Sequence, residues 1–327
     1  MNIGTIGTSW ITSAFINAVK AAGSFTVTAV YSRSHDNASA FAESHGAAHV
    51  YTDLVEMAKS KEIDCVYIAS PNSLHYEHVI QFLKQKKHVI CEKPVFSNTA
   101  ELKHAHEVAE ENDVYLFEAV RNLHSPNFSK LQAESHKIGQ VRSLLFQYSK
   151  YSSKYDAYLN GENPNIFSLD FSGGALVDLG VYPLYLAVGL YGVPKQVSYH
   201  PVILDSGVDG NGTLVLDYVD FTCTIMFSKI SNSFNSCEIH GEEATLVFEN
   251  AGTILNLERI HSKTKEKTSI ETVEQQHDMM FEIQNFRSII DTENKLEYER
   301  LRDLSFQVLS ITETARKQNN IIFKSEL

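Results

Sequence analysis

Cysteine, proline and tryptophan are scarce in this chain, which has 4, 7 and 1 of them among 327 residues. No two cysteines have C-x-x-C spacing, and so few in so long a chain do not build a disulfide framework. That usage suits a reducing compartment. No apolar run approaches the ~18 residues of a membrane span, and the first residues lack a signal-like basic and apolar segment. We therefore expect a cytoplasmic protein without a membrane partner.

Positive charge is also in short supply. Lys and Arg number 28 against 40 Asp and Glu, so the formal net charge is −12. A chain this acidic repels phosphate backbones, which argues against nucleic acid as a partner. The 43% of hydrophobic residues argues against a disordered chain. At ~100–200 residues per domain, the length predicts two domains.

The first third of the chain alternates short apolar strands with helices. The predicted strands are Asn2–Ile6, Phe25–Tyr31, Val50–Tyr51, Cys65–Ala69, His88–Cys91 and Val114–Phe117. Helical spacing fills the intervals, and Asn98 with Glu101 three residues later resembles a capping box. Strand, helix, strand at this rhythm predicts βαβ units and a parallel sheet.

The rhythm changes after about Glu118. Strand follows strand at Gln196–Leu204, Gly212–Tyr218, Phe221–Phe227, Ser236–His240, Thr245–Glu249 and Thr253–His261. A turn is expected at Asp209 to Gly212, and a helical tail from about Met279 to Gln318. The predicted fold class is α/β. It combines an N-terminal Rossmann-type domain at residues 1–118 with an α+β domain at 119–327, which carries a large, mostly antiparallel sheet. The C-terminal helix is a candidate to pack back on the first domain.

A glycine-poor loop joins the first strand to the first helix. Of the three glycines of a dinucleotide fingerprint only Gly7 is present, with Ser9 and Thr12 at the other two positions. Serine still allows close backbone approach, and a helix N-terminus attracts phosphate. The alternative is an ordinary βα turn. The candidate pyrophosphate-binding residues are Gly7, Thr8, Ser9, Trp10 and Ile11. The sequence does not decide whether Trp10 covers a cofactor or packs inside.

The end of the second strand bears on the choice of cofactor. An acidic residue there would bind the ribose of NAD. The chain has Ser32 and Arg33 instead, which suit the 2′-phosphate of NADP. We therefore expect NADP, with NAD as the alternative. The competing reading makes Arg33 a surface cation.

Four later motifs carry a specific resemblance. They are Ser70-Pro71-Asn72 followed by His75, Glu92-Lys93-Pro94, the stretch from Gly173 to Tyr182, and the stretch from Glu238 to Thr245. In their order and placement they resemble the Gfo/Idh/MocA family, named for glucose–fructose oxidoreductase and inositol dehydrogenase. Tyr182 stands where many members have His, as in the branch of the dimeric dihydrodiol dehydrogenases. Ala244 departs from the family pattern, as do Ser9 and Thr12.

The resemblance implies a catalytic set. Tyr182 is expected to donate or accept the proton, Lys93 to be its electrostatic partner, and Asp178 to orient substrate or lysine. A nearby ammonium makes chemical sense, since it lowers a phenol's pKa from ~10. Asp178 and Tyr182 are four residues apart and so are neighbours on a helical face. The competing readings are a turn lysine, a packing tyrosine and a surface acid.

Further residues are assigned by the same resemblance. Cofactor contacts are expected from Glu92 and Lys93, and around the nicotinamide from Ser70, Pro71, Asn72 and His75. Arg121 and Asn122 are weaker candidates for substrate contact. The 14 histidines form no H-E-x-x-H motif or compact set with cysteine, so no metal is expected.

Together these features predict an NADP(H)-dependent oxidoreductase. It would move hydride to or from a hydroxyl or carbonyl carbon of a sugar, polyol or dihydrodiol-like molecule. The alternatives are a redox-neutral, nicotinamide-dependent glycosidase and a non-catalytic NADP-sensing protein. The resemblance also implies a homo-oligomer, a dimer or tetramer, joined through the C-terminal sheet.

Overall fold

The computed structural model describes all 327 residues and divides into two compact units. The first contains Met1–Arg121 and Gln276–Phe306, and the second contains Asn122–Gln275 and Gln307–Leu327. The chain therefore passes from the first unit to the second, returns to the first, and ends in the second. The expected boundary near Glu118 falls three residues before the first crossing. Gln276–Phe306 groups with the first unit, where the C-terminal helix was a candidate to pack, but sequence periodicity does not mark the limits of this segment.

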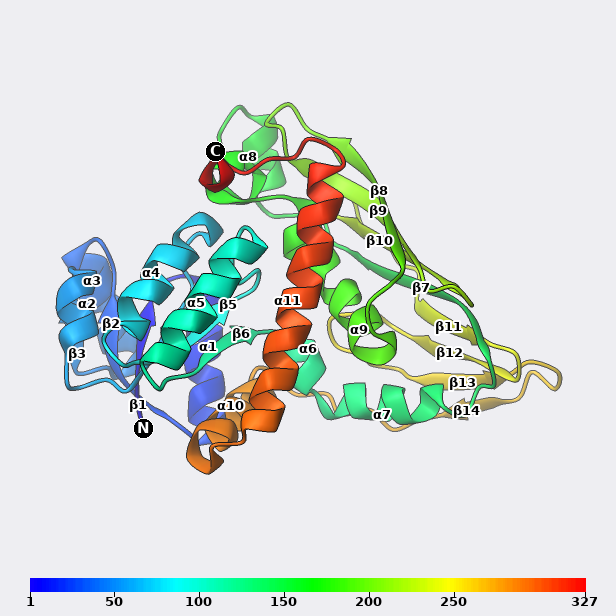
Figure 1. The fold of residues 1–327 in the computed structure, drawn as a ribbon, viewed down its shortest axis with the longest axis horizontal. Helices are drawn as coiled ribbons and strands as arrows, with labels where there is room; N and C mark the ends of the chain where they lie inside the picture. Colours follow the sequence, from blue (N-terminus) through cyan, green and yellow to red (C-terminus); the bar gives the residue numbers. More distant parts are fainter. The chain divides into compact units, whose positions relative to one another are not determined.

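A six-stranded parallel sheet forms the centre of the first unit, in the order β3-β2-β1-β4-β5-β6 (Figure 1). Its strands are β1 (Asn2–Ile6), β2 (Thr26–Tyr31), β3 (His49–Tyr51), β4 (Cys65–Ile68), β5 (His88–Glu92) and β6 (Leu116–Ala119). The connecting helices are α1 (Trp10–Ala22), α2 (His35–His45), α3 (Leu54–Lys59), α4 (His75–Leu83) and α5 (Thr99–Glu111). The strand order reverses between β1 and β4, where doubly wound sheets bind ligands.

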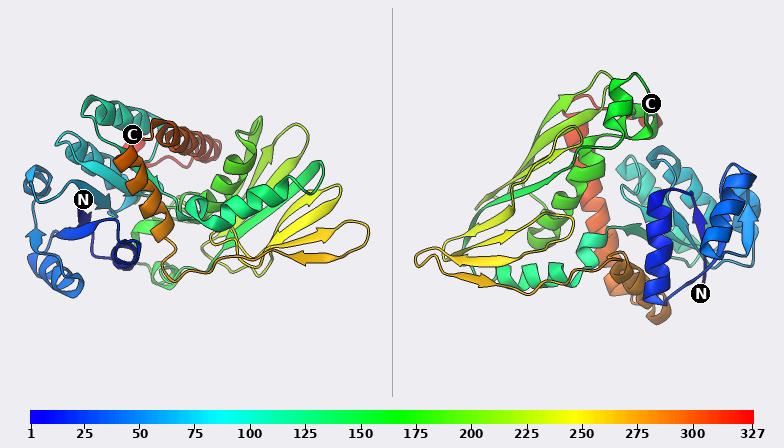
Figure 2. Two further views of the ribbon diagram at one scale, coloured as in Figure 1. Left: turned by 90° about the horizontal axis from the view of Figure 1, so that it is seen from below. Right: turned by 180° about the vertical axis from the view of Figure 1, so that it is seen from behind.

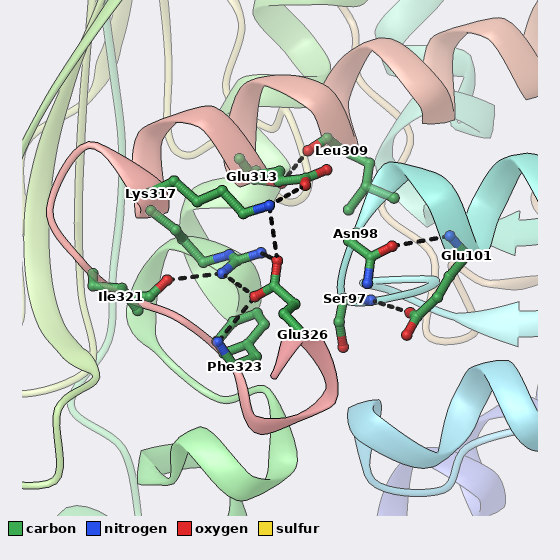
Figure 3. Close-up of polar contacts among 11 residues, drawn as sticks. Ser97, Asn98, Glu101, Leu309, Glu313, Lys317, Ile321, Phe323 and Glu326 are labelled. Atoms are coloured by element: carbon green, nitrogen blue, oxygen red, sulfur yellow. Dashed lines mark hydrogen bonds and ion pairs between the residues drawn. The ribbon is translucent and has the colours of Figure 1, made fainter.

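Local signals in the sequence set several of these helix ends. The Asp53 carboxylate accepts hydrogen bonds from the backbone N–H groups of Val55 and Glu56, and so caps α3. The Asn98 side chain accepts from the Glu101 N–H, while the Glu101 carboxylate accepts from the N–H of Ser97 (Figure 3). The expected capping pair is therefore present, with its return bond displaced by one residue.

The returning segment completes the core of the first unit. Helix α10 (Met280–Thr292) packs beside α1, and its Ile283 and Phe286 join Phe15 and Tyr67 in one buried cluster. The rings of Phe117 and Phe286 stack with their centres 4.5 Å apart. Hydrophobic burial thus ties a C-terminal helix to the N-terminal sheet.

The second unit is built on an eight-stranded sheet in the order β14-β13-β12-β11-β7-β10-β9-β8. The strands are β7 (Val141–Ser149), β8 (Gln196–Ile203), β9 (Asp209–Asp217), β10 (Thr222–Ser228), β11 (Cys237–Gly241), β12 (Ala244–Phe248), β13 (Glu258–His261) and β14 (Lys267–Ser269). Only β7 and β10 pair in parallel. The predicted fold class, a parallel α/β sheet followed by a mostly antiparallel one, is confirmed.

Three details of this sheet differ from the sequence prediction. Strand β7 was not predicted, although it lies inside the sheet between β10 and β11. The turn expected at Asp209 to Gly212 is wrong, because Asp209 is buried and begins β9. The last predicted strand begins at Glu258 rather than Thr253, because positive backbone angles at Ile254 and Asn256 interrupt it.

Helices cover one face of this sheet. Helix α9 (Val181–Tyr191) packs against β7 and β10, and α7 (Pro126–Ser135) lies on the same side (Figures 1 and 2). The shorter helices of the second unit are α6 (Arg121–His124, which starts at the boundary) and α8 (Tyr155–Leu159). Helix α11 (Lys295–Lys317) begins in the first unit and ends in the second.

One helical stretch, Leu169–Tyr191, is long and apolar enough to pass for a membrane span by composition, with a mean hydropathy of 1.4. The expectation that no stretch approaches a span needs this correction. Within the fold 78% of that window is buried, as in a core helix, because α9 lies beneath the sheet.

Candidate active site

The predicted cofactor residues of the first unit gather at one edge of its sheet. Gly7 follows β1, Ser32 follows β2, Ser70 follows β4, and Lys93 follows β5. All these strands are parallel, so their carboxyl ends share one edge. That edge includes the switch point between β1 and β4, where a dinucleotide binds in a doubly wound sheet.

Gly7 makes the turn that the loop after β1 requires. Its φ is 107°, and a Cβ there would lie 2.9 Å from the Ala69 carbonyl oxygen, so a side chain is excluded. Ser9 is the N-cap of α1 but caps no backbone N–H with its side chain, and the first turn holds no acidic residue. The N–H groups and positive end of α1 are thereby left for an anion. Thr8 and Ile11 flank this turn and are half-buried.

Trp10, the first residue of α1, is 75% exposed. Its side chain is therefore not packed in the core.

Ser32 and Arg33 occupy the loop between β2 and α2. The Ser32 N–H donates to the Tyr51 carbonyl at 3.2 Å, and the Ser32 hydroxyl accepts from the Ser34 N–H at 3.4 Å. The Arg33 side chain is exposed. The nearest acid along the chain, Asp36, lies in the first turn of α2 beyond the loop. This loop accordingly has a hydroxyl and a guanidinium in reach of a phosphate and no carboxylate of its own.

The turn that carries Lys93 is held by buried groups. The Lys93 N–H donates to Glu92 Oε2 at 3.2 Å, and the Tyr67 hydroxyl donates to Glu92 Oε1 at 2.5 Å. Burial raises the pKa of Glu92, while the Tyr67 hydrogen bond and Lys93 lower it. Glu92, expected to contact the cofactor, thus also holds the turn that carries Lys93.

Glu118 supports the other side of the same turn. Its Oε1 accepts from the N–H of Val95 at 3.0 Å, and Ser305 donates to its other oxygen. Sequence reasoning missed Glu118. Its only signal is an acidic residue inside an otherwise apolar strand, and the partner from the returning segment is invisible without the structure.

His75 joins two of the loops at this edge. Its ring is completely buried, with Nε2 2.8 Å from the Ser70 carbonyl oxygen and Nδ1 3.0 Å from that of Pro94. Burial is the main cause that lowers its pKa. The loop after β4, with Pro71 and Asn72, is therefore tied to the turn after β5.

The second unit places Asp178 and Tyr182 at the start of α9. Leu176–Gly180 forms a π-helical turn that runs directly into α9. Such turns are rare and are frequent at functional sites. Asp178 lies in this turn and Tyr182 in the first turn of α9, so the helix between them is wider than the α-helix that was expected. Tyr182 is 8% exposed, and its ring meets that of Tyr148 edge-on at 5.4 Å.

Asp178 forms an ion pair with Lys229, which follows β10 and is 4% exposed. A buried ion pair of this kind is strong only when its geometry and further hydrogen bonds are good. Lys229 was missed by sequence reasoning, since a single lysine after a strand carries no motif. Its ammonium also lies 5.9 Å from the centre of the Phe167 ring.

The two weaker candidates fall in different units. Arg121 ends the first unit, where its Nε lies 3.4 Å from Asp278 Oδ2. Asn122 begins the second and is 1% exposed; its amide donates to the carbonyls of Tyr182 and Ala251 at 3.2 and 3.0 Å. Asn122 therefore fastens the backbone of Tyr182, and its expected place as a substrate contact is not supported by this burial.

The first unit meets the chemical needs of a dinucleotide. The glycine turn excludes a side chain, α1 offers an open N-terminus, and Arg33 offers a guanidinium at the ribose end. Residues 1–120 match the family model "Oxidoreductase family, NAD-binding Rossmann fold", and residues 130–247 match "GFO/IDH/MocA C-terminal domain". The chain belongs to the Gfo/Idh/MocA family of oxidoreductases.

Two similar proteins match nearly the whole chain, and a third matches about two thirds of it. The scyllo-inositol 2-dehydrogenase (NADP(+)) IolU of Bacillus subtilis is 43% identical over 98% of both chains. The uncharacterized oxidoreductase YgjR of Escherichia coli is 41% identical over 98% of this chain and 97% of its own. A trans-1,2-dihydrobenzene-1,2-diol dehydrogenase of Danio rerio is 29% identical over 67% of this Gfo/Idh/MocA chain and 65% of its own.

Solved structures share the fold. KijD10, a 3-ketoreductase of Actinomadura kijaniata solved with NADP and TDP-benzene, superposes with a TM-score of 0.82 at 22% identity over 97% of both chains. At that identity the likeness concerns the fold alone. The family predicted from the motifs after β4 and β5 is confirmed by the family models.

Proposed function

We propose that this protein is an NADP(H)-dependent oxidoreductase that interconverts a hydroxyl and a carbonyl group on a cyclic polyol of the inositol type. One observation carries the proposal: the glycine turn, the Ser32–Arg33 loop and the Lys93 turn converge on the switch-point edge of one sheet. The relative from Bacillus subtilis, alike over its full length, supports NADP as cofactor and an inositol as substrate.

Each catalytic residue has a proposed task. Tyr182 exchanges a proton with the substrate oxygen, because its phenol is almost buried and held by Tyr148 and by the Asn122 bond to its backbone. Lys93 supplies positive charge at that oxygen. Asp178, held by Lys229, orients a substrate hydroxyl. The nicotinamide, when bound, accepts or supplies the hydride.

The cofactor residues divide into contacts and supports. Gly7, Thr8, Ser9 and Ile11 receive the pyrophosphate, and Ser32 with Arg33 receives the 2′-phosphate. Ser70, Pro71, Asn72 and Glu92 line the nicotinamide side. His75 is proposed as a positioning residue, because its ring is buried behind the loops that it joins.

Fluorescence titration tests the cofactor. Trp10 is the only tryptophan and is exposed beside the glycine turn, so NADPH should quench its emission and accept its energy. Titration with NADPH and NADH should show tighter binding of NADPH.

Turnover of NADP with scyllo-inositol and other inositols should then exceed turnover with open-chain sugars. A retained cofactor without net absorbance change would instead favour the redox-neutral glycosidase, and binding without turnover a sensor.

The Arg33→Ala variant tests the 2′-phosphate contact. It should weaken NADPH binding by about tenfold or more, the equivalent of a charge-assisted hydrogen bond, and leave NADH binding unchanged. Arg142→Ala is the matched control, because Arg142 is an exposed arginine of β7 that pairs with Glu242. Equal loss for both cofactors would refute the assignment.

We further propose a role for each unit, a cellular compartment and an oligomeric state for the protein. The first unit serves as the NADP domain and the second as the substrate-binding and oligomerisation domain. The protein is proposed to be a cytoplasmic homodimer. Support comes from four buried free cysteines and from half-buried residues on the second sheet's uncovered face, such as Leu145, Val215 and Thr224.

A further inference from the structure

The first unit contains a cavity of about 790 Å³ that is separate from the nucleotide site. It is lined by residues from the C-terminal part of α5, the end of α10 and the first part of α11, together with His88 and Tyr115. His88 begins β5 and Tyr115 directly precedes β6, so the cavity lies at the amino edge of the sheet. The nucleotide residues lie at the opposite, carboxyl edge. Figure 1 shows α5 beside the lower part of α11. The volume of the cavity is within the usual range for a small-molecule site.

The floor of the cavity is aromatic and uncharged. The rings of Tyr115 and Tyr298 meet edge-to-face at 4.7 Å. The Tyr115 N–H donates to His88 Nδ1 at 3.0 Å, so this nitrogen carries no proton. Burial lowers the pKa of His88, and burial together with Arg302 lowers that of His106 to about 4. Both imidazoles are therefore neutral near pH 7.

The rim is acidic. Three more carboxylates than cationic side chains line the cavity. Lys103 lies 3.9 Å from Glu107, and Arg302 lies 3.1 Å from Asp303. The remaining carboxylates, which form no ion pair in the structure, are those of Glu110, Asp113, Glu293 and Glu299.

The charges of two of these carboxylates raise the pKa values of the two tyrosines in the cavity. Burial raises the pKa of Tyr115, and the charge of Glu293 raises it further. Burial likewise raises the pKa of Tyr298, to about 12; the Leu116 hydrogen bond and the charge of Arg302 oppose this shift, and the charge of Glu110 adds to it. The carboxylates of Glu110 and Glu293 line the same cavity as these two rings, whose faces attract a cation.

We propose that this cavity binds a small organic cation with an apolar body, an aromatic or alkyl amine, with its ammonium group between Glu110 and Glu293 and against the rings of Tyr115 and Tyr298. The excess of carboxylates over cationic side chains repels an anion and attracts a cation more strongly than a neutral molecule. The aromatic floor suits the apolar body of such an amine. The site is independent of the proposed oxidoreductase function.

Calorimetric titration of the full-length, NADPH-saturated protein tests the ligand class. The probes are 2-phenylethylamine, the uncharged 3-phenylpropan-1-ol and the anionic 3-phenylpropanoate. The amine should bind, the alcohol should bind at least about tenfold more weakly, and the anion should not bind detectably. No binding of the amine at millimolar concentration, or equal binding of amine and alcohol, would overturn the proposal.

Variants locate the binding. Glu110→Gln and Glu293→Gln should each lower the amine affinity about threefold to tenfold, because each removes one carboxylate beside the rings. Glu43→Gln is the matched control, since Glu43 is an exposed carboxylate on α2 outside the cavity. Circular dichroism confirms that each variant is folded. Unchanged affinity in both cavity variants would place the amine elsewhere and refute the site; turnover, measured separately, reports on the oxidoreductase function.

Discussion

At the residue scale, the second unit places polar groups at the start of a helix that otherwise packs in the core. Helix α9 is buried along nearly all of its length, yet Tyr182 stands at its start beside a π-helical turn with Asp178 and Lys229. An apolar core helix has no structural need for an ion pair between a half-buried acid and a buried lysine in the turn that precedes it. This juxtaposition is the strongest structural support for assigning the proton transfer to Tyr182.

Replacing Tyr182 by Phe removes the proposed acid–base hydroxyl and keeps the ring. The turnover number should fall by about a hundredfold or more, because positioned proton transfer contributes that much to a rate, while NADPH binding stays unchanged. Steady-state rates and Trp10 fluorescence measure the two quantities. Tyr218→Phe is the control, since its hydroxyl donates to the Gly192 carbonyl near the sheet edge and should be dispensable for turnover. Near-normal turnover of the Tyr182 variant would contradict the assignment.

Asp209 gives a pH dependence of stability. Burial raises its pKa to about 6, although hydrogen bonds from Tyr199 and the Leu176 N–H oppose the shift. The folded state therefore holds this proton at pH values where the unfolded state has lost it. Its contribution to the free energy of unfolding is full below about pH 4 and is lost as the pH rises through 6.

The Asp209→Asn variant removes that titration. Between pH 4 and 6, the free energy of unfolding of the unmodified protein relative to the variant should fall as the pH rises, by up to about 1.4 kcal/mol per pH unit. Urea unfolding at several pH values measures this slope. Asp205→Asn, an exposed acid in the preceding turn, should keep the original slope. Parallel curves for all three proteins would show that Asp209 does not titrate as described.

At the element scale, the C-terminal turn is fastened to the end of α11. Arg316, which is 1% exposed, pairs with Glu326 at 2.9 Å and lies over the Phe323 ring at 3.7 Å. Glu326 also accepts from the Phe323 N–H at 2.9 Å, and Lys317 approaches it at 3.4 Å (Figure 3). Ile321 and Phe323 are thus held in the core of the second unit, while the terminal Leu327 is exposed.

Truncating Glu326 to Ala should destabilise the protein by about 3 kcal/mol, since a buried guanidinium loses its carboxylate partner. Chemical denaturation with a fluorescence readout gives the value. The control is Lys324→Ala, because Lys324 is largely exposed and its pair with Asp170 should be worth no more than about 1 kcal/mol. Equal effects of the two substitutions would argue against the buried pair as the anchor.

At the scale of the whole molecule, one face of the eight-stranded sheet carries no helix. Thr224 stands near its middle, paired across strands with Leu145 on one side and Val215 on the other. The side chains around Thr224 are small or apolar, and Glu238 on β11 lies opposite Leu145. An apolar patch with a polar border suits self-association.

Thr224→Arg should convert the proposed dimer to a monomer, because it places a charge at the centre of the contact. Light scattering after size-exclusion chromatography reports the mass. Val55→Arg, which adds the same charge to an exposed site on α3, should leave the mass unchanged. A monomeric unmodified protein, or a Thr224 variant that remains dimeric, would exclude this face as the interface.

The sequence by itself determined the parallel sheet, because each βα unit carries its own apolar period, caps and turn residues. It also determined the positions of Gly7, Arg33, Lys93 and Tyr182, which local motifs mark. Only the tertiary structure decided that α10 completes the first unit, that β7 lies inside the second sheet, and that Lys229 pairs with Asp178. These features join residues far apart in the chain, and the burial that selects them has no local signal. The scarcity of cysteine likewise excluded a disulfide framework, whereas the fold showed that all four thiols are buried and free.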